Sequence, residues 1–230
     1  AEVVAVDAQQ CVAVPAAVDD VTAAAIANPG MSSWVALMLR ANFQAGESVL
    51  INGAAGASGR LAIQIARHLG AGRIVATARN PEHETTLRGL GADAFIALNQ
   101  PEEVLTDAFV GEIAANGVDV VLDYLWGPPA GCLLNAIARE TAAARFVNIG
   151  SMAGMALPLS AGALRSTDLT LMGSGLGSVS KIELVQAVAQ VLAAVTLAGL
   201  QVDAVAVPAS QVAQAWQSAT TQRQVLTFSG

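Results

Sequence analysis

Apolar runs and helical patterns alternate along most of this chain. Val49–Ile51 is a short apolar run with β-branched residues, as expected of a buried parallel strand. A glycine-rich turn follows, and apolar residues then recur at helical spacing as far as Leu69. Gly70 ends this helix, and Ile74–Thr77 predicts the next strand. The stretch therefore predicts one strand–loop–helix–strand unit.

The same alternation continues beyond residue 80. Further strands are predicted at 94–98, 118–123, 145–149 and 169–172, and helices at 81–91, 101–116 and 130–138. Strands that alternate with helices are typical of an α/β protein with a doubly wound parallel sheet, the Rossmann architecture. Ligands of such sheets bind beyond the carboxyl ends of the strands. Four places meet this condition: the glycine turn, Arg79-Asn80, Tyr124-Leu125 and Gly150-Ser151.

The two ends of the chain are patterned differently. Residues 3–6 and 12–14 predict two strands, which are too few to form a sheet and indicate that the chain starts within a domain. A helix is expected over 21–27, a break at Asn28-Pro29-Gly30, and a second helix over 34–40.

The segment Ile182–Leu200 is apolar enough to be tested as a membrane span. Its polar residues Glu183, Gln186 and Gln190 fall on one side at helical spacing, opposite an apolar side. This pattern predicts an amphipathic helix that lies on the sheet, and it argues against a span.

The glycine turn has the spacing Gly53-x-x-Gly56-x-x-Gly59. Gly53 and Gly56 leave room for phosphate oxygens against the backbone, and Gly59 lets the new helix pack close to the strand. The free N–H groups at the start of that helix would face a pyrophosphate. Because the turn joins a predicted strand to a predicted helix, a nucleotide phosphate site is favoured over a turn with a purely structural role.

The end of the second strand indicates which nucleotide is bound. Proteins that bind NAD have an acidic residue here for the ribose hydroxyls. This chain has Arg79 and Asn80 instead, and its next carboxylate is Glu82. A guanidinium can bind a 2′-phosphate with two hydrogen bonds, whereas a carboxylate would repel it. NADP(H) is therefore favoured, and the alternative is an ordinary surface arginine.

Composition narrows the class of partner. The 230 residues are 54% hydrophobic and 13% charged, with a net charge of −7. This acidity argues against binding to nucleic acid or to an anionic membrane. Cys11 and Cys132 make no disulfide framework and no signal peptide is evident, so a cytoplasmic protein is expected.

Six motifs, in order along nearly the whole chain, resemble the medium-chain dehydrogenase/reductase superfamily, specifically its zinc-free, quinone-oxidoreductase-like branch. They are Asn28-Pro-Gly-Met-Ser-Ser-Trp34, Asn52-Gly-Ala-Ala-Gly-Ala-Ser-Gly59, Leu90-Gly-Ala-Asp93, Asp119-Val-Val-Leu-Asp123, Asn148-Ile-Gly-Ser151 and Gly173-Ser-Gly-Leu-Gly177.

The resemblance implies an NADPH-dependent oxidoreductase that transfers hydride to a quinone, an enone or a similar carbonyl compound, and that forms a homodimer. It also implies three parts. Residues 1–20 would end a mostly-β GroES-like catalytic domain, 21–175 would form the Rossmann domain, and 176–230 would return to the catalytic domain. The resemblance further implies that most of the GroES-like domain is missing from this chain.

The resemblance also assigns roles by position. Ala55, Gly56, Ala57 and Ser58 would bind pyrophosphate, and Arg79 with Asn80 the 2′-phosphate. Tyr124, Gly150 and Ser151 would lie beside the nicotinamide ribose and ring, Ser32 near the carboxamide, and Gly173 and Gly175 close to the nicotinamide. Tyr124, the only tyrosine, is also a candidate proton donor to a reduced carbonyl, the alternative being packing against the cofactor.

Zinc is not expected. Zinc-dependent relatives supply a cysteine ligand where Asn28-Pro29-Gly30 stands here, and His68 and His83 have no ligand partners at suitable spacing. A zinc-type alcohol dehydrogenase with its ligands in the missing domain stays an alternative. A short-chain reductase is disfavoured because Pro128 occupies the lysine position of a Tyr-x-x-x-Lys pair. A non-catalytic NADPH-binding module, with a sensor or structural role, is the remaining alternative.

Overall fold

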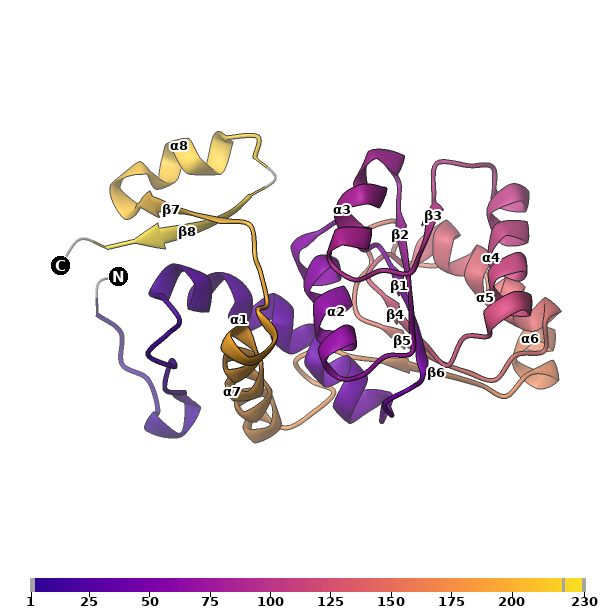
Figure 1. Cartoon of the computed structure of the whole chain (residues 1–230), viewed down its shortest axis with the longest axis horizontal. Helices are drawn as coiled ribbons and strands as arrows, with labels where there is room; N and C mark the ends of the chain where they lie inside the picture. Colours follow the sequence, from indigo (N-terminus) through magenta and orange to yellow (C-terminus); the bar gives the residue numbers. More distant parts are fainter. Residues whose placement is uncertain (1–2, 221, 229–230) are drawn as a thin grey trace.

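The computed structural model describes residues 3–220 and 222–228. A central sheet is covered by helices on both faces, and a small strand–helix–strand unit lies at the far end, near both termini (Figure 1). The central sheet has six strands: β1 (Ser48–Asn52), β2 (Arg73–Ala78), β3 (Ala94–Ala97), β4 (Val120–Asp123), β5 (Ala144–Asn148) and β6 (Leu169–Gly173).

All pairs in this sheet are parallel, in the order β3-β2-β1-β4-β5-β6. The order reverses between β1 and β4, which is the topological switch point of a doubly wound sheet. The predicted fold class is therefore confirmed. Five helices connect the strands: α2 (Ala57–His68), α3 (Glu84–Gly89, after a 3₁₀ turn Pro81–His83), α4 (Glu102–Asn116), α5 (Gly127–Arg139) and α6 (Ala161–Ser166).

Alternate residues of the buried strands serve opposite faces, which is why these strands have nearly continuous apolar sequences. Val49 and Ile51 of β1 belong to the core beneath α1, α2 and α7, together with Leu61. Leu50, between them, points to the other core with Phe109 of α4. Each face of the sheet is thus closed by its own layer of helices.

The N-terminal strands predicted at 3–6 and 12–14 are wrong. Residues 3–18 contain only a 3₁₀ turn, Ala8–Gln10, and otherwise irregular backbone. The apolar side chains of Val3 and Val4 are 86% and 72% exposed. No strand among the described residues lies alongside to accept their backbone hydrogen bonds, and an unpaired run does not form a stable strand.

The break predicted at Asn28-Pro29-Gly30 is also wrong. α1 (Asp20–Val35) runs through Pro29 without interruption and continues as a π-helical turn, Ala36–Arg40. Packing overrides the local cost of proline, because α1 lies against both α2 and α7. Gly30 lies so close to α7 that a Cβ atom there would be 2.6 Å from Val191 Cγ1.

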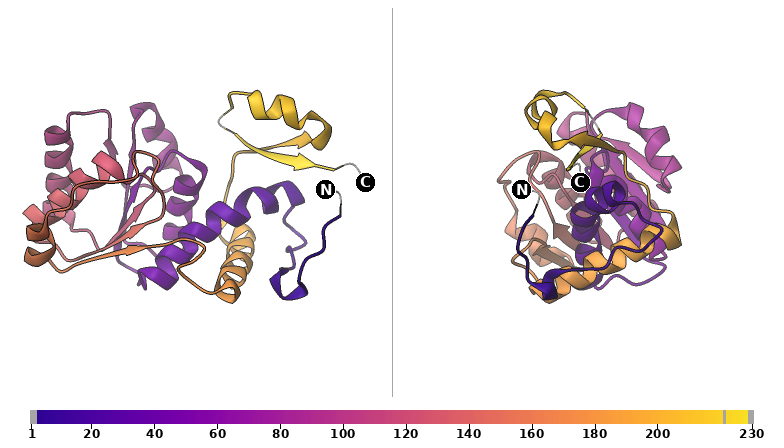
Figure 2. Two further views of the ribbon diagram at one scale, coloured as in Figure 1. Left: turned by 180° about the vertical axis from the view of Figure 1, so that it is seen from behind. Right: turned by 90° about the vertical axis from the view of Figure 1, so that its left-hand side faces the viewer.

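The helix predicted at 182–200 forms as α7 (Lys181–Ala198), but it packs against α1 and not directly on the sheet, as Figure 2 shows from two sides. The expected location on the sheet is therefore corrected. By length and composition α7 could also span a membrane, a test that core helices also pass. Its buried residues Ala187, Val191, Leu192 and Ala194 form one side of an amphipathic helix.

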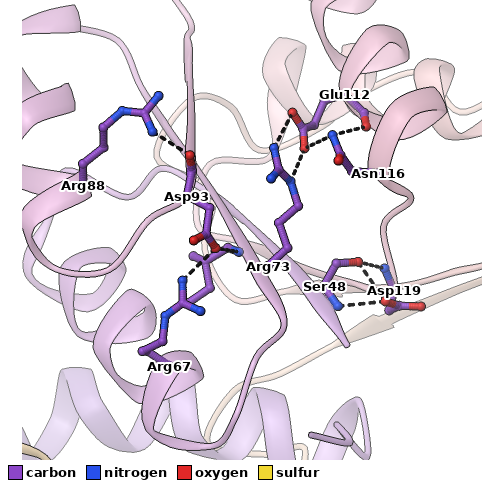
Figure 3. A network of polar contacts seen from close by, with 9 residues as sticks. Ser48, Arg67, Arg73, Arg88, Asp93, Glu112, Asn116 and Asp119 are labelled. Atoms are coloured by element: carbon purple, nitrogen blue, oxygen red, sulfur yellow. Dashed lines mark hydrogen bonds and ion pairs between the residues drawn. The ribbon is translucent and has the colours of Figure 1, made fainter. Parts of the chain in front are cut away.

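A second, two-stranded parallel sheet follows α7. Its strands are β7 (Ala204–Pro208) and β8 (Arg223–Thr227), joined through a 3₁₀ turn, Ala209–Gln211, and α8 (Val212–Gln217). Polar contacts also fix the amino ends of the main strands: Asp93 accepts from Arg67, Arg73 pairs with Glu112 at 2.7 Å, and Ser48 bonds to Asp119 (Figure 3).

Candidate cofactor site

The glycine turn is shaped by two close approaches. Gly53 has φ +96°, and a Cβ atom there would lie 2.8 Å from the Leu125 side chain. A Cβ atom on Gly59 would lie 2.5 Å from the Ala54 Cα and the Gly53 carbonyl oxygen. Both contacts leave room for hydrogen only, so these positions require glycine and α2 begins directly against β1.

The amino terminus of α2 is uncapped. Its N-cap residue is Gly56, and no side chain among the described residues accepts a hydrogen bond there. The first N–H groups of an α-helix have no partner within the helix, and the helix dipole adds partial positive charge at the same place. This terminus is a suitable binding site for an anionic group such as a phosphate.

A cavity of about 800 Å³ lies at the carboxyl ends of the strands and includes this terminus. Its volume falls in the range typical of ligand and cofactor sites. Of the residues predicted for the site, the following line the cavity: Ala55, Gly56, Ala57, Ser58, Arg79, Tyr124 and Gly150. Segments that are far apart in the sequence thus come together around one cavity, as the switch-point rule for such sheets predicts.

The charges around the cavity are one-sided. Its lining includes Arg79, at the end of β2, and Arg223, from β8, and no described lining residue is a carboxylate. The whole chain carries a net charge of −7, so this distribution is opposite to the protein's average. Two arginines that share a cavity with an uncapped helix terminus favour a ligand with several negative charges.

The remaining predicted residues lie outside this cavity. Ser32 and Gly175 line a separate cavity of about 130 Å³. The carbonyl oxygen of Gly173 accepts a hydrogen bond from Arg40 Nε at 2.9 Å, and Ser151 Oγ donates to Met155 Sδ at 3.2 Å. The structure therefore divides the predicted set between one large cavity and its surroundings.

Asn80 is engaged elsewhere. Its Oδ1 accepts from the Glu82 N–H at 3.0 Å, and its Nδ2 donates to Glu82 Oε2 at 2.9 Å. These bonds cap the 3₁₀ turn that follows β2 and hold a carboxylate beside Asn80. Arg79 alone of the pair lines the cavity.

The Tyr124 side chain is buried, with 9% exposure, and its hydroxyl lies 2.8 Å from Ser33 Oγ on α1. Burial raises the pKa of Tyr124 to about 12, against the opposing effect of the Ser33 hydrogen bond. The hydroxyl therefore stays protonated at neutral pH. Tyr124 lines the cavity, while its hydroxyl oxygen lies against Ser33 of α1.

Sequence reasoning missed two features of the site. Arg223 comes from the C-terminal β8 and carries no motif that would link it to a cavity at β2. Asp123, the last residue of β4, is fully buried and hydrogen-bonds to Asn52 and Asn148 at the ends of the neighbouring strands. The three polar residues do share one sequence signal, since each one ends an apolar strand.

A zinc ion needs a cluster of donor side chains. In residues 3–220 and 222–228, no three His, Cys, Asp or Glu side chains lie close enough together to hold a metal ion. His68 is exposed on α2 with its ring 6.1 Å from that of Trp34, and Cys132 is buried in the core. The described residues of this chain do not fit a zinc ion.

The fold and the cavity define a Rossmann-type nucleotide-binding protein. Residues 57–196 match the family described as zinc-binding dehydrogenase, and the chain belongs to this family. The resemblance to the medium-chain dehydrogenase/reductase superfamily is thereby confirmed.

Three relatives illustrate the similarity. A probable NADPH-dependent quinone reductase of Emericella nidulans is 29% identical over 89% of this chain and 60% of its own length. An alcohol dehydrogenase superfamily protein from Novosphingobium aromaticivorans superposes with a TM-score of 0.77 at 26% identity, covering 95% of this chain and 66% of that one. The mycobacterial protein Rv1454c, solved with NADPH, gives 0.75 at 20% identity, covering 89% and 62%. This chain spans less than two thirds of each of these relatives.

Proposed function

We propose that this chain is the nucleotide-binding part of a cytoplasmic, NADPH-dependent oxidoreductase that reduces a quinone, an enone or a similar carbonyl compound without zinc. The observation that carries the proposal is the cavity of about 800 Å³. Its lining includes an uncapped helix terminus and two arginines, and none of its described lining residues is a carboxylate. The quinone reductase of Emericella nidulans supports the reaction class. The lack of a metal donor set among the described residues supports zinc independence.

The roles proposed for the residues follow from their places in the cavity. The N–H groups at the start of α2 bind the pyrophosphate, and the guanidinium groups of Arg79 and Arg223 bind the 2′-phosphate. Gly150 and the Tyr124 ring lie against the nicotinamide ribose and ring. When bound, NADPH supplies the hydride, so the chain's own task is to hold and orient it.

The predicted site residues outside the cavity have supporting roles in this proposal. Asn80 holds the turn after β2, while Ser32, Ser151, Gly173 and Gly175 shape the border of the nicotinamide end. Residues 1–20 and 176–230 would belong with a second, substrate-binding domain, and 21–175 with the nucleotide domain. We further propose a homodimer, and light scattering of the purified chain would test it.

Titration with NADPH and NADH is the direct test. We expect tight binding of NADPH and weaker binding of NADH, followed by fluorescence of the reduced nicotinamide. Arg79→Glu should weaken NADPH binding at least about tenfold while changing NADH binding much less, because only NADPH carries the 2′-phosphate. Arg165→Glu makes the same charge change on exposed α6, away from the cavity, and serves as the matched control.

The outcomes separate the candidate functions. Equal losses of NADPH and NADH binding in Arg79→Glu would refute the 2′-phosphate role. Binding of neither nucleotide by the wild-type chain would refute the cofactor assignment for this chain. Tight NADPH binding without NADPH oxidation by a panel of quinones, in a longer form that includes the second domain, would favour a non-catalytic sensor or structural module.

A further inference from the structure

A buried carboxylate lies at the strand ends beside the cavity. Asp123 has no exposed surface, and it is the residue at which β4 ends. Its Oδ1 accepts from Asn52 Nδ2 at 2.9 Å, and its Oδ2 accepts from Asn148 Nδ2 at 3.0 Å. Asn52 ends β1 and Asn148 ends β5, so one row of hydrogen bonds crosses three adjacent strands.

Every described hydrogen-bond partner of this carboxylate is a donor. Besides the two amides, the backbone N–H groups of Leu125 and Trp126 donate to it at 3.1 Å. A protonated carboxyl group would need an acceptor for its own proton, and these partners offer none. The arrangement therefore fits the ionised form, although burial raises the pKa of Asp123 above its ordinary value.

The same carboxylate shapes the turn after β4. Trp126 has φ +54°, which is uncommon for a residue with a side chain, and its N–H is held by both oxygens of Asp123. The turn is locked to the one after β5, because Ala153 N donates to the Leu125 carbonyl oxygen at 2.8 Å. Leu125 also lies against Gly53 of the glycine turn.

The two asparagines extend the row to the other cavity loops. Asn148 Nδ2 donates to the Gly150 carbonyl oxygen at 2.8 Å as well as to Asp123. Asn52 Oδ1 accepts from Thr77 Oγ1 at 2.9 Å, and Thr77 Oγ1 in turn accepts from the Gly53 N–H at 3.0 Å. Three loops that line the cavity are thus tied to one carboxylate.

We propose that Asp123 is a positioning residue of the cofactor cavity. Resting on the NADPH site proposed above, its carboxylate holds the glycine turn, the turn after β4 and the Gly150 turn in the mutual arrangement that the cofactor needs. The sheet itself depends far less on this residue, because its backbone ladder and its two apolar cores are made by other groups.

The chain contains a matched control at the opposite end of the same two strands. Asp119 Oδ2 accepts from both the N–H and the Oγ of Ser48 at 2.8 Å, which joins the start of β1 to the residue before β4 (Figure 3). Asp119 and Ser48 do not line the cavity. Asp123→Asn and Asp119→Asn therefore make the same chemical change at the two ends of the same strand pair. Only Asp123→Asn removes contacts to the loops that line the cavity.

The experiment measures NADPH dissociation constants by fluorescence, thermal midpoints, and backbone hydrogen exchange for wild type, Asp123→Asn and Asp119→Asn. In Asp123→Asn one oxygen becomes an NH₂ group that faces N–H donors, so a loop contact is lost. We expect NADPH binding to weaken about tenfold or more in Asp123→Asn and by less than about twofold in Asp119→Asn. The amides of Leu125 and Trp126 should exchange faster only in the former.

Two further variants keep the test decisive. Ile137→Val lowers stability through the core of α5 and separates general destabilisation from loop positioning; its NADPH affinity should match wild type. Asn148→Ala removes less, because the hydrogen bonds from Leu125 and Trp126 to Asp123 stay in place. It replaces Asp123→Asn if that variant does not fold, and it should weaken NADPH binding about threefold or more.

The outcomes are distinguishable from those of the proposed function. An unchanged NADPH affinity in Asp123→Asn, or equal losses in Asp123→Asn and Asp119→Asn, would overturn the positioning role while leaving the NADPH site intact. Failure of the wild-type chain to bind NADPH would count against the proposed function instead. In that case the exchange rates decide the inference: unchanged protection of the turn after β4 in Asp123→Asn overturns it.

Discussion

Replacing Tyr124 by phenylalanine removes one oxygen and leaves the aromatic ring. The lost contact is the 2.8 Å hydrogen bond to Ser33 Oγ. Ser33 Oγ also lies 3.2 Å from the Pro29 carbonyl oxygen and 3.3 Å from that of Ser58, so its proton keeps an acceptor. The cost at neutral pH is therefore that of one neutral hydrogen bond, about 1 kcal/mol.

The difference in unfolding free energy between wild type and Tyr124→Phe should change sign at alkaline pH. The pKa of Tyr124 is raised from 10.0 to about 12 by burial, so its contribution to stability is fully present below pH 10 and is lost as the pH rises through 12. Two pKa units correspond to about 3 kcal/mol. Tyr124→Phe should thus be about 1 kcal/mol less stable than wild type at pH 7, equal to it near about pH 11, and more stable above that.

The assay is denaturant unfolding of both proteins between pH 7 and pH 11.5. Other titrating groups are common to the two proteins and cancel in the difference. A difference in unfolding free energy that stays constant over this range would refute the argument, because a tyrosine that is accessible to solvent when folded has no raised pKa to lose.

The same variant tests the chemistry. If the hydroxyl only holds Ser33 while the ring packs on the cofactor, NADPH affinity and turnover in a catalytically complete form should change by less than about threefold. A proton donor in the transition state contributes about 10²–10⁴-fold to the rate. A loss of that size, with the affinity for NADPH unchanged, would assign Tyr124 to proton donation.

Other expectations concern the packing of single glycines. Gly59→Ala should abolish NADPH binding and destabilise the fold by about 1–3 kcal/mol, because the new Cβ atom would lie 2.5 Å from backbone atoms. Gly111→Ala, at an exposed position of α4 where a Cβ atom meets nothing within 4 Å, should be neutral or stabilising. Calorimetry and NADPH titration of both variants would test this. Gly30→Ala should lower the free energy of unfolding by about 1–3 kcal/mol, because the new Cβ atom would collide with Val191. The double variant Gly30→Ala/Val191→Ala should lose less stability than the sum of the two single variants, and strict additivity would contradict the contact.

Much of the core of this protein follows from local sequence pattern. The central strands β1, β2 and β4 are mostly apolar runs between turn residues, because both faces of the sheet are buried there. The glycine turn could be predicted because its three glycines, spaced three residues apart, lie between a predicted strand and a predicted helix. Arg79 could be predicted because it directly follows the strand that leads to the cavity.

Features that depend on tertiary contacts could not be predicted from the local sequence. Proline predicts a helix break, yet α1 continues through Pro29 because its buried faces meet α2 and α7. The apolar runs at 3–6 and 12–14 have the composition of strands, but strands need partners, and none of the described residues provides one.

The site itself divides in the same way. Its backbone parts, the glycine turn and the uncapped amino terminus of α2, lie within one short segment, so the local sequence pattern predicts them. Its long-range parts, the Asp123 hydrogen-bond row and Arg223 from the C-terminal β8, join residues separated by many elements. Such contacts form only when the sheet brings strand ends together, and no local pattern records which polar residues will meet there.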